Sequence, residues 1–159
     1  AQLTGQEFST AYRDNVLQKP DALFDSAFTT RAIVAVGQIA AEFEPKLLNA
    51  LQKARYIDAQ DTSLSAVVAS VTARFLAAAG HLIDEAEFVN RLEAESALEV
   101  RTGNRVRDAV KRMKALSSSG VPALVITVGD HQEVVQGPQL YSGGATALAA
   151  ITAVASRAA

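Results

Sequence analysis

The chain has 159 residues, the size of one domain or of one domain with an insertion. Hydrophobic residues make up 49% and charged residues 20%, an ordinary globular composition that excludes disorder as a global description. Fifteen Lys and Arg residues against 17 Asp and Glu residues give a net charge of −2 without long blocks of one sign, so no nucleic-acid partner is expected. No apolar run approaches the roughly 18 residues that cross a bilayer, so we expect a soluble protein without a membrane partner.

The sequence contains no cysteine and only two histidines. It therefore has no thiolate of its own for disulfide formation, metal binding or redox chemistry. His81 and His131 lie far apart in the sequence and neither has a third ligand nearby, so no metal site is expected. The first residue is not methionine, and we expect the chain to start at a processed or truncated end.

The first two thirds of the chain predict helices with a period of 3.6 residues. Thr4 and Glu7 have capping-box spacing, so the first helix is expected to begin there and to run to about Leu17. A second helix is expected after Ser26, with an apolar face that continues to Phe43.

The next helices are predicted from residues that begin or end a helix. Pro45 fits the first helical position, where the missing N–H of proline costs nothing, and predicts a helix that continues to about Tyr56. Asp84 and Ser96 are each followed three residues later by a glutamate, which predicts two further helix starts. The helix before Asp84 is expected to run from Leu64 to Gly80. The helix that begins at Ser96 is expected to end at about Leu116.

The pattern changes at Ser117, where a Ser- and Gly-rich loop leads into Val121-Pro122. The apolar run Ala123–Val128 predicts a β-strand. Gly129-Asp130 predicts a two-residue hairpin turn, and His131–Val135 predicts the returning strand.

The predicted strand over 123–128 needs more neighbours than the sequence supplies. Its continuous apolar composition is typical of a strand that is covered on both faces. Only one other strand is predicted, and an isolated two-stranded hairpin is marginally stable in water. We therefore expect the sheet to be completed by a missing segment or by another chain, such as a second copy in a homo-oligomer. After Gly137-Pro138, a linker through Tyr141 is expected to lead to a last helix that ends near Arg157.

Two groups of segments resemble one known family. Gly120-Val121-Pro122-Ala123-Leu124-Val125-Ile126, the hairpin, Gly137 and the terminal helix resemble the C-terminal half of a DsbA-like thioredoxin fold. The upstream segments resemble the helical insertion of bacterial DsbA-related proteins known as predicted protein-disulfide isomerases. These segments are Phe24-Asp25-Ser26, Arg31-Ala32 and Ala50-Leu51-Gln52-Lys53-Ala54-Arg55-Tyr56 with Asp61 beyond.

The resemblance spans about Leu3 to Val154 and implies an α/β, thioredoxin-like fold with a large helical insertion. In this chain the fold is expected to be mostly helical, with a C-terminal β-hairpin and helix. Residues 1–116 would form the helical insertion region. Residues 117–159 would form the C-terminal part of the thioredoxin-like domain, including its cis-proline loop.

The resemblance also implies a function, that of a thiol-disulfide oxidoreductase or protein disulfide isomerase. Members of the family begin with a strand, a helix that carries Cys-x-x-Cys and another strand, and this sequence has no counterpart of that unit. We therefore expect the unit to be missing upstream, and we expect the chain to be catalytically inactive by itself. No catalytic residue is assigned within the chain.

Gly120, Val121 and Pro122 are the residues to which the resemblance gives a role, that of substrate binding. A cis Val121-Pro122 bond is implied, which would expose the backbone of Val121 to an extended substrate. By itself, the sequence favours an ordinary trans proline at a strand start and a turn role for Gly120. Tyr56 is interpreted either as lining a groove between the helical insertion and the sheet or, preferably, as a packing residue with its hydroxyl at the rim.

The resemblance implies a cysteine-containing protein or a small thiol as substrate and no cofactor, apart from glutathione as a candidate. Two alternatives stay open at this point. One is a glutathione-dependent isomerase of the kappa-transferase type, and the other is a non-catalytic helical binding or assembly module. A cytoplasmic location is expected, with the periplasm as the alternative.

Overall fold

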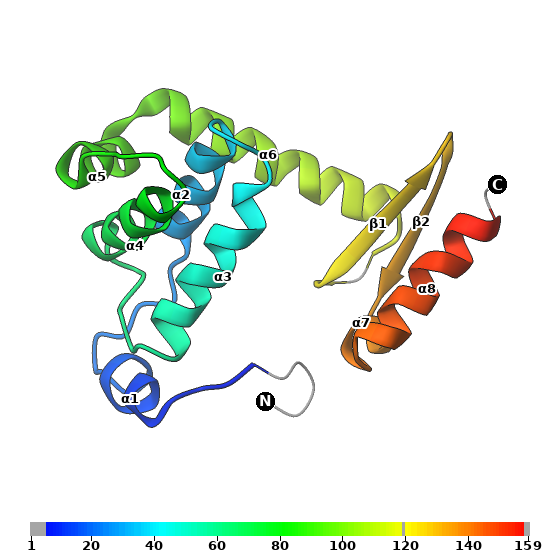
Figure 1. Cartoon of the computed structure of the whole chain (residues 1–159), viewed down its shortest axis with the longest axis horizontal. Coiled ribbons are helices and arrows are strands. Elements are labelled where there is room, and N and C mark those ends of the chain that lie inside the picture. Colours follow the sequence, from blue (N-terminus) through cyan, green and yellow to red (C-terminus); the bar gives the residue numbers. More distant parts are fainter. Residues whose placement is uncertain (1–5, 119, 158–159) are drawn as a thin grey trace. The chain divides into compact units, whose positions relative to one another are not determined.

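The computed structural model describes residues 6–118 and 120–157, without the side chain of Pro138, and its packing divides the chain into two units (Figure 1). The helical unit consists of Glu7–Asn104. The hairpin unit consists of Gln6 and the described residues from Arg105 onward. None of the helices within the described ranges combines the length and hydropathy that crossing a membrane requires.

The helical unit is built from short and medium-length helices, and its last helix, α6, continues into the hairpin unit. In chain order the elements are α1 (Thr10–Tyr12), the π-helical turn η1 (Arg13–Leu17), α2 (Ala27–Gly37), α3 (Phe43–Tyr56), α4 (Ser65–Ala78), α5 (Glu85–Ala94) and α6 (Ser96–Ala115).

Local capping chemistry sets several of these boundaries as predicted. The Asp84 carboxylate accepts a hydrogen bond from the Glu87 backbone N–H at 2.8 Å, which confirms the predicted start of α5. Gly80 follows the end of α4 with a φ of +86°, and the His81 N–H donates to the Leu76 carbonyl at 2.8 Å. This left-handed glycine closes the helix because it allows the chain to fold back on the last turn.

The first two predicted helices differ from those observed. α1 begins at Thr10 and is capped by Ser9, whose Oγ accepts from the Tyr12 N–H at 3.0 Å. Thr4 of the predicted capping box lies outside the described residues. α2 ends at Gly37 and does not continue to Phe43, because the chain tightens into turns in which the Gln38 N–H donates to the Ala35 carbonyl at 3.2 Å.

Pro45 lies at the third position of α3 rather than at the predicted first position, because α3 already begins at Phe43. The first four N–H groups of an α-helix have no partner within the helix, so a proline in this turn removes no helical hydrogen bond. α3 ends at Tyr56, as predicted.

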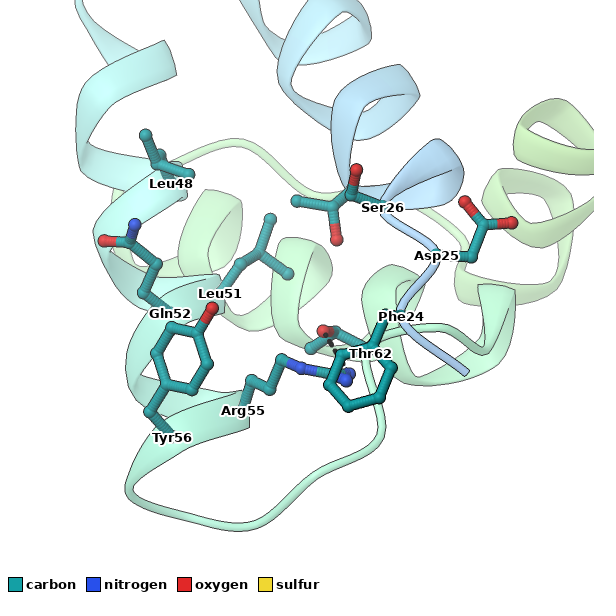
Figure 2. Close-up of a pocket in the computed structure, with 10 residues that line it drawn as sticks. Phe24, Asp25, Ser26, Leu48, Leu51, Gln52, Arg55, Tyr56 and Thr62 are labelled. Carbon is teal, nitrogen blue, oxygen red and sulfur yellow. Dashed lines mark hydrogen bonds between the residues drawn. The ribbon is translucent and has the colours of Figure 1, made fainter. Parts of the chain in front are cut away.

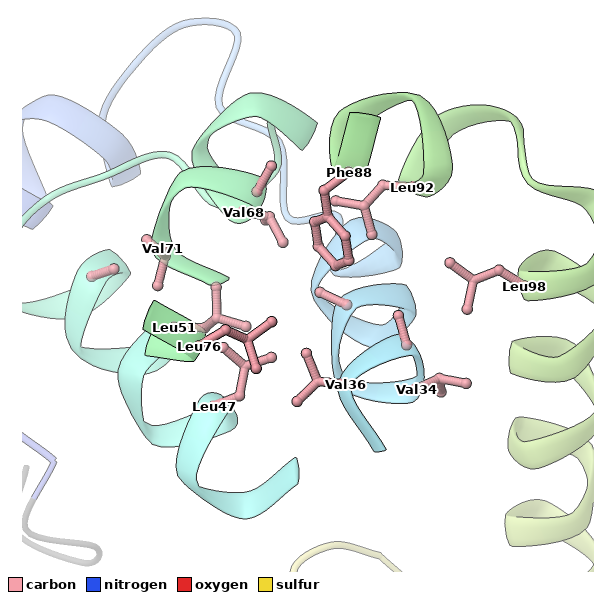
Figure 3. Close-up of a cluster of buried hydrophobic side chains, with 14 residues drawn as sticks. Val34, Val36, Leu47, Leu51, Val68, Val71, Leu76, Phe88, Leu92 and Leu98 are labelled. Atoms are coloured by element: carbon pink, nitrogen blue, oxygen red, sulfur yellow. The ribbon is translucent and has the colours of Figure 1, made fainter. Parts of the chain in front are cut away.

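The core of the helical unit lies where α2, α3, α4, α5 and α6 face one another (Figure 3). Leu47 of α3, Leu76 of α4 and Leu92 of α5 are completely buried. Burial of each such side chain stabilises the fold by about 1.5–3 kcal/mol relative to an exposed position. The other large or branched members of this cluster are Val34, Val36, Leu51, Val68, Val71, Phe88 and Leu98.

The hairpin unit contains a two-stranded antiparallel sheet and two helices that follow it in the chain. Strand β1 (Ala123–Val128) pairs with β2 (His131–Gln136), and Val128 lies opposite His131. The predicted two-residue turn at Gly129-Asp130 is confirmed, and Gly129 has a φ of +57°. Helices α7 (Pro138–Tyr141) and α8 (Gly144–Arg157) complete the unit, and α7 occupies the segment predicted to be a linker.

Strand β1 is less buried than its composition predicted. Leu124 and Thr127 are exposed, and the other four residues of β1 are half-buried. In the described residues β1 has one strand neighbour, β2, and the hairpin packs against α8. Val135 of β2 and Val154 of α8 are both buried, so the apolar contact of this unit lies between the hairpin and α8. The expectation that the chain supplies one strand neighbour for β1 is confirmed for the described residues.

Removal of a core side chain should destabilise the helical unit. We expect Leu47→Ala to lower the free energy of unfolding by about 2–5 kcal/mol, because it leaves a cavity among completely buried neighbours. Urea denaturation followed by circular dichroism measures the change. The matched control is Leu82→Ala, at a leucine that is 88% exposed, for which a change within about 0.5 kcal/mol is expected. Equal losses in the two variants would contradict the assignment of Leu47 to the core.

Candidate functional site

Gly120, Val121 and Pro122 form the exposed approach to β1 in the hairpin unit. All three residues are exposed, and the Val121 residue is 77% exposed. The peptide bond between Val121 and Pro122 is cis. Ser118 connects this approach to β2, because its Oγ lies 3.2 Å from the Gly120 carbonyl oxygen and 2.9 Å from Oε1 of Gln136.

The backbone beside this approach has free hydrogen-bonding capacity. β1 pairs with β2 along one edge, and within residues 6–118 and 120–157 no strand lies along its other edge. In the same ranges the N–H and C=O of Val121 have no hydrogen-bond partner. An unpaired strand edge of this kind can accept a further extended segment.

The helical unit contains a second candidate site, a pocket of about 230 Å³ between the start of α2, the outer side of α3 and the loop after α3 (Figure 2). Two segments that carried the family resemblance meet here, although about 25–30 residues separate them. The residues that line the pocket are Phe24, Asp25, Ser26, Thr29, Leu48, Leu51, Gln52, Arg55, Tyr56 and Thr62.

The Arg55 guanidinium connects three segments of the chain at one side of this pocket. It donates to the Leu23 carbonyl at 3.1 Å, and its Nη1 lies 3.4 Å from Oδ1 of Asp61 and 3.4 Å from Oγ1 of Thr62. The Arg55 side chain is only 11% exposed, so its charge needs these partners. It also lies 6.0 Å from the centre of the Phe24 ring, within the range of cation–π attraction.

Asp61 is held as a carboxylate beside Arg55. Burial raises its pKa, but the hydroxyl and backbone N–H of Ser63, at 2.6 and 3.1 Å, lower it, as do the charges of Arg55 and Lys19. The lowering contributions prevail, so the pKa of Asp61 lies below its ordinary value. The charge of Arg55 is therefore balanced by an anion at neutral pH.

The packing interpretation of Tyr56 is confirmed, whereas the pocket that it lines lies within the helical unit. Its ring makes edge contacts with Tyr12, at 5.2 Å between ring centres, and with Phe8, at 5.1 Å. The same residue lines the pocket, and Figure 2 shows its hydroxyl directed toward Leu51. Aromatic packing thus fixes the ring and places the hydroxyl at the pocket.

Four neutral polar side chains at the pocket have no hydrogen-bond partner in the described part of the chain: Ser26 Oγ, Thr29 Oγ1, the Gln52 amide and the Tyr56 hydroxyl. Ser26 occupies the N-cap position of α2 but does not cap it. Asp25 accepts from the Ala27 N–H at 2.8 Å in its place. Each of the four free groups can both donate and accept, which suits an uncharged hydrogen-bonding ligand.

Neither histidine is placed for metal chemistry. His81 contacts the ring of Phe43 at 5.6 Å between centres, and His131 Nε2 lies 3.8 Å from a carboxylate oxygen of Glu133. Among the residues that the structure describes, no three His, Asp or Glu side chains gather as ligands would.

The pairing of Asp61 with Arg55 should make the stability of the helical unit depend on pH. A carboxylate whose pKa is lowered in the folded state stabilises the fold at pH values above its unfolded-state pKa. This stabilisation is lost as the pH falls through the folded-state pKa. We therefore expect the melting temperature of wild type to fall more steeply than that of Asp61→Asn as the pH is lowered below about 4. Thermal melts from pH 7 to pH 2.5 measure this difference. Parallel curves for the two proteins would contradict it.

Comparison with known proteins identifies the fold. The sequence matches no protein-family model and no curated protein. Among solved structures, the chain is similar to the cytosolic disulfide reductase DsbM from Pseudomonas aeruginosa, with a TM-score of 0.71, 24% identity and coverage of 96% of this chain and 71% of that one. It is also similar to a proposed protein disulfide isomerase from Nitrosomonas europaea, with a TM-score of 0.58, 22% identity and coverage of 83% of this chain and 57% of that one. The chain thus shares the fold of these two proteins, over about seven tenths and just over half of their lengths.

Proposed function

We propose that this chain is the helical and C-terminal part of a DsbA-like thiol-disulfide oxidoreductase. The observation that carries the proposal is the fold likeness to a disulfide reductase over 96% of this chain. In this proposal residues 1–116 are the helical insertion region, and residues 117–159 belong to the thioredoxin-like domain. The same neighbour is described as cytosolic, which supports a cytoplasmic location.

The substrate in this proposal is a protein or small thiol that binds at Gly120, Val121 and Pro122. Val121 is 77% exposed, and its N–H and C=O lack partners in the described ranges, so both can pair with an extended segment. Addition of a strand at this point would place the substrate alongside the entrance to β1.

The reacting thiols must come from outside the 159 residues, since the sequence contains no cysteine. We assign them to a Cys-x-x-Cys unit encoded upstream, whose first strand would also cover the open edge of β1. One thiolate of that unit attacks a substrate disulfide, which gives a mixed disulfide and releases one substrate thiol. The second thiol of the unit then attacks the mixed disulfide and releases the other substrate thiol. The substrate is thereby reduced, and the unit becomes oxidised to a disulfide.

The proposed function is tested on the protein that the complete reading frame encodes. We expect the frame to encode Cys-x-x-Cys before residue 1, and we expect the purified product to reduce insulin disulfides with dithiothreitol or glutathione as the electron source. A frame that encodes no cysteine, or a product without activity toward insulin and glutathione disulfides, would refute the proposal. A light-scattering mass that grows with concentration, in a product without cysteine, would favour an assembly module.

A pair of substitutions tests the docking role of Val121 in the encoded protein. Val121→Pro removes the backbone N–H that a docked segment would use, and Val121→Ala keeps that N–H and shortens the side chain. Because one hydrogen bond contributes about 0.5–1.5 kcal/mol, we expect Val121→Pro to raise the KM for insulin roughly three- to tenfold. Val121→Ala should change the KM less than twofold. Equal effects of both variants would show that the side chain, and not the backbone, contacts the substrate.

A further inference from the structure

The pocket of the helical unit is lined by apolar side chains, neutral polar side chains and two charged residues. Leu51 is buried at its floor, while Leu48 and Phe24 are 39% and 72% exposed. Exposed apolar groups gathered around a concave site mark ligand-binding or protein-binding surfaces more often than scattered ones do. The volume of about 230 Å³ is smaller than the pockets that hold drug-sized molecules, and it suits one side chain.

The charges around the pocket argue against an anionic ligand. Among the described residues that line the pocket, Arg55 is the one cation, and this guanidinium already donates to Leu23, Asp61 and Thr62. The other charged residue of the lining is Asp25, which repels carboxylates. An acidic ligand would therefore lose solvation without gaining a free cation.

The polar rim instead matches the backbone of a polypeptide. Four groups lack partners in the described part of the chain, and each can donate and accept: Ser26 Oγ, Thr29 Oγ1, the Gln52 amide and the Tyr56 hydroxyl. Backbone N–H and C=O groups need both kinds of partner when they leave water. A free apolar molecule would offer these four groups no partner, whereas the backbone of an extended peptide offers both donors and acceptors.

We propose that this pocket binds one large uncharged side chain, aromatic or long aliphatic, of an extended polypeptide, and that its rim hydrogen-bonds the backbone of that polypeptide. The polypeptide nature of the ligand rests on the proposed function. The site lies entirely in the helical unit and uses none of Gly120, Val121 and Pro122. It would select substrates by a residue other than the reacting cysteine.

The sequence allows a direct binding test, since the chain contains no tryptophan and a tryptophan in a ligand can be followed alone. The probe is a cysteine-free peptide of seven residues with blocked ends, one central tryptophan, and glycine and serine neighbours. We expect saturable binding to the 159-residue chain with a blue-shifted emission. Binding should be weaker when glutamates flank the tryptophan, and free tryptophan, which carries both charges, should bind more weakly than the peptide. Equal binding of all three ligands, or none of the first, would overturn the proposal.

Matched variants locate the peptide. Phe24→Ser should raise the Kd of the peptide roughly tenfold or more, whereas Leu82→Ser, at a still more exposed leucine outside the pocket, should leave the Kd unchanged. Gln52→Ala should weaken binding roughly three- to tenfold, whereas Lys53→Ala, at the next exposed position of α3, should not. Gln52 and Lys53 are both exposed, so their substitution tests binding even if Phe24→Ser disturbs the contact between Phe24 and Arg55. If both variants of each pair raised the Kd of the peptide equally, the proposal would be overturned.

The outcome is independent of redox chemistry, because neither the peptide nor the chain has a thiol. Peptide binding with these variant effects, in a protein that fails to reduce insulin, would refute the proposed function and support a polypeptide-binding pocket. Insulin reduction that is unaffected by Phe24→Ser and Gln52→Ala, together with no peptide binding, would support the proposed function and refute this inference.

Discussion

The helical unit is organised around one nearly buried positive charge. Arg55 of α3 reaches the carbonyl of Leu23, the carboxylate of Asp61 and the hydroxyl of Thr62, which belong to segments before and after the helix. A guanidinium that is withdrawn from water must find acceptors or it destabilises the fold by several kcal/mol. The positions of the segment before α2 and of the loop after α3 therefore depend on this side chain. The pocket lies between the segments that Arg55 holds together.

The two units differ in how much of their stability comes from apolar contacts within the unit. The helical unit buries leucine and valine side chains from five helices in one cluster, which is the normal basis of a stable small fold. In the hairpin unit, the buried apolar residues of the strands and α8 are Val135 and Val154. A two-stranded sheet with one covering helix is close to the lower limit of independent stability. The hairpin unit is therefore the part whose stability depends most on additional sheet partners, and such partners would lie along β1.

Features that depend on a few neighbouring residues were predictable from the sequence. The Asp84 cap, the stop at Gly80 and the turn at Gly129-Asp130 each involve a local hydrogen bond or a local backbone angle. The end of α2 was predicted wrongly although its last residue is Gly37, because apolar residues continue the helical spacing as far as Phe43. The family resemblance indicated the fold, which the structural neighbours support.

The candidate site was only partly visible in the sequence. Gly120, Val121 and Pro122 are consecutive, and their exposed position before β1 follows from the loop and strand pattern. The pocket requires Phe24 and Ser26 to meet Gln52 and Tyr56, and no periodicity within either segment predicts that contact. The available signal was that both segments carried the family resemblance, which indicates positions under common constraint but not their proximity. The composition of β1 indicated that further sheet partners are missing, because composition reports the environment of a complete sheet.

The composition of β1 has a practical consequence. Its six residues, Ala123–Val128, include no charged side chain and no proline, whereas Glu133 and His131 are on β2, the strand that is already its partner. Lysines, prolines and bulges are the devices by which natural sheets keep their edges from adhering to other molecules, and this strand has none of them. In concentrated solution β1 is therefore the segment at which copies of the chain would first aggregate, and a single lysine at the exposed Thr127 is the simplest protection.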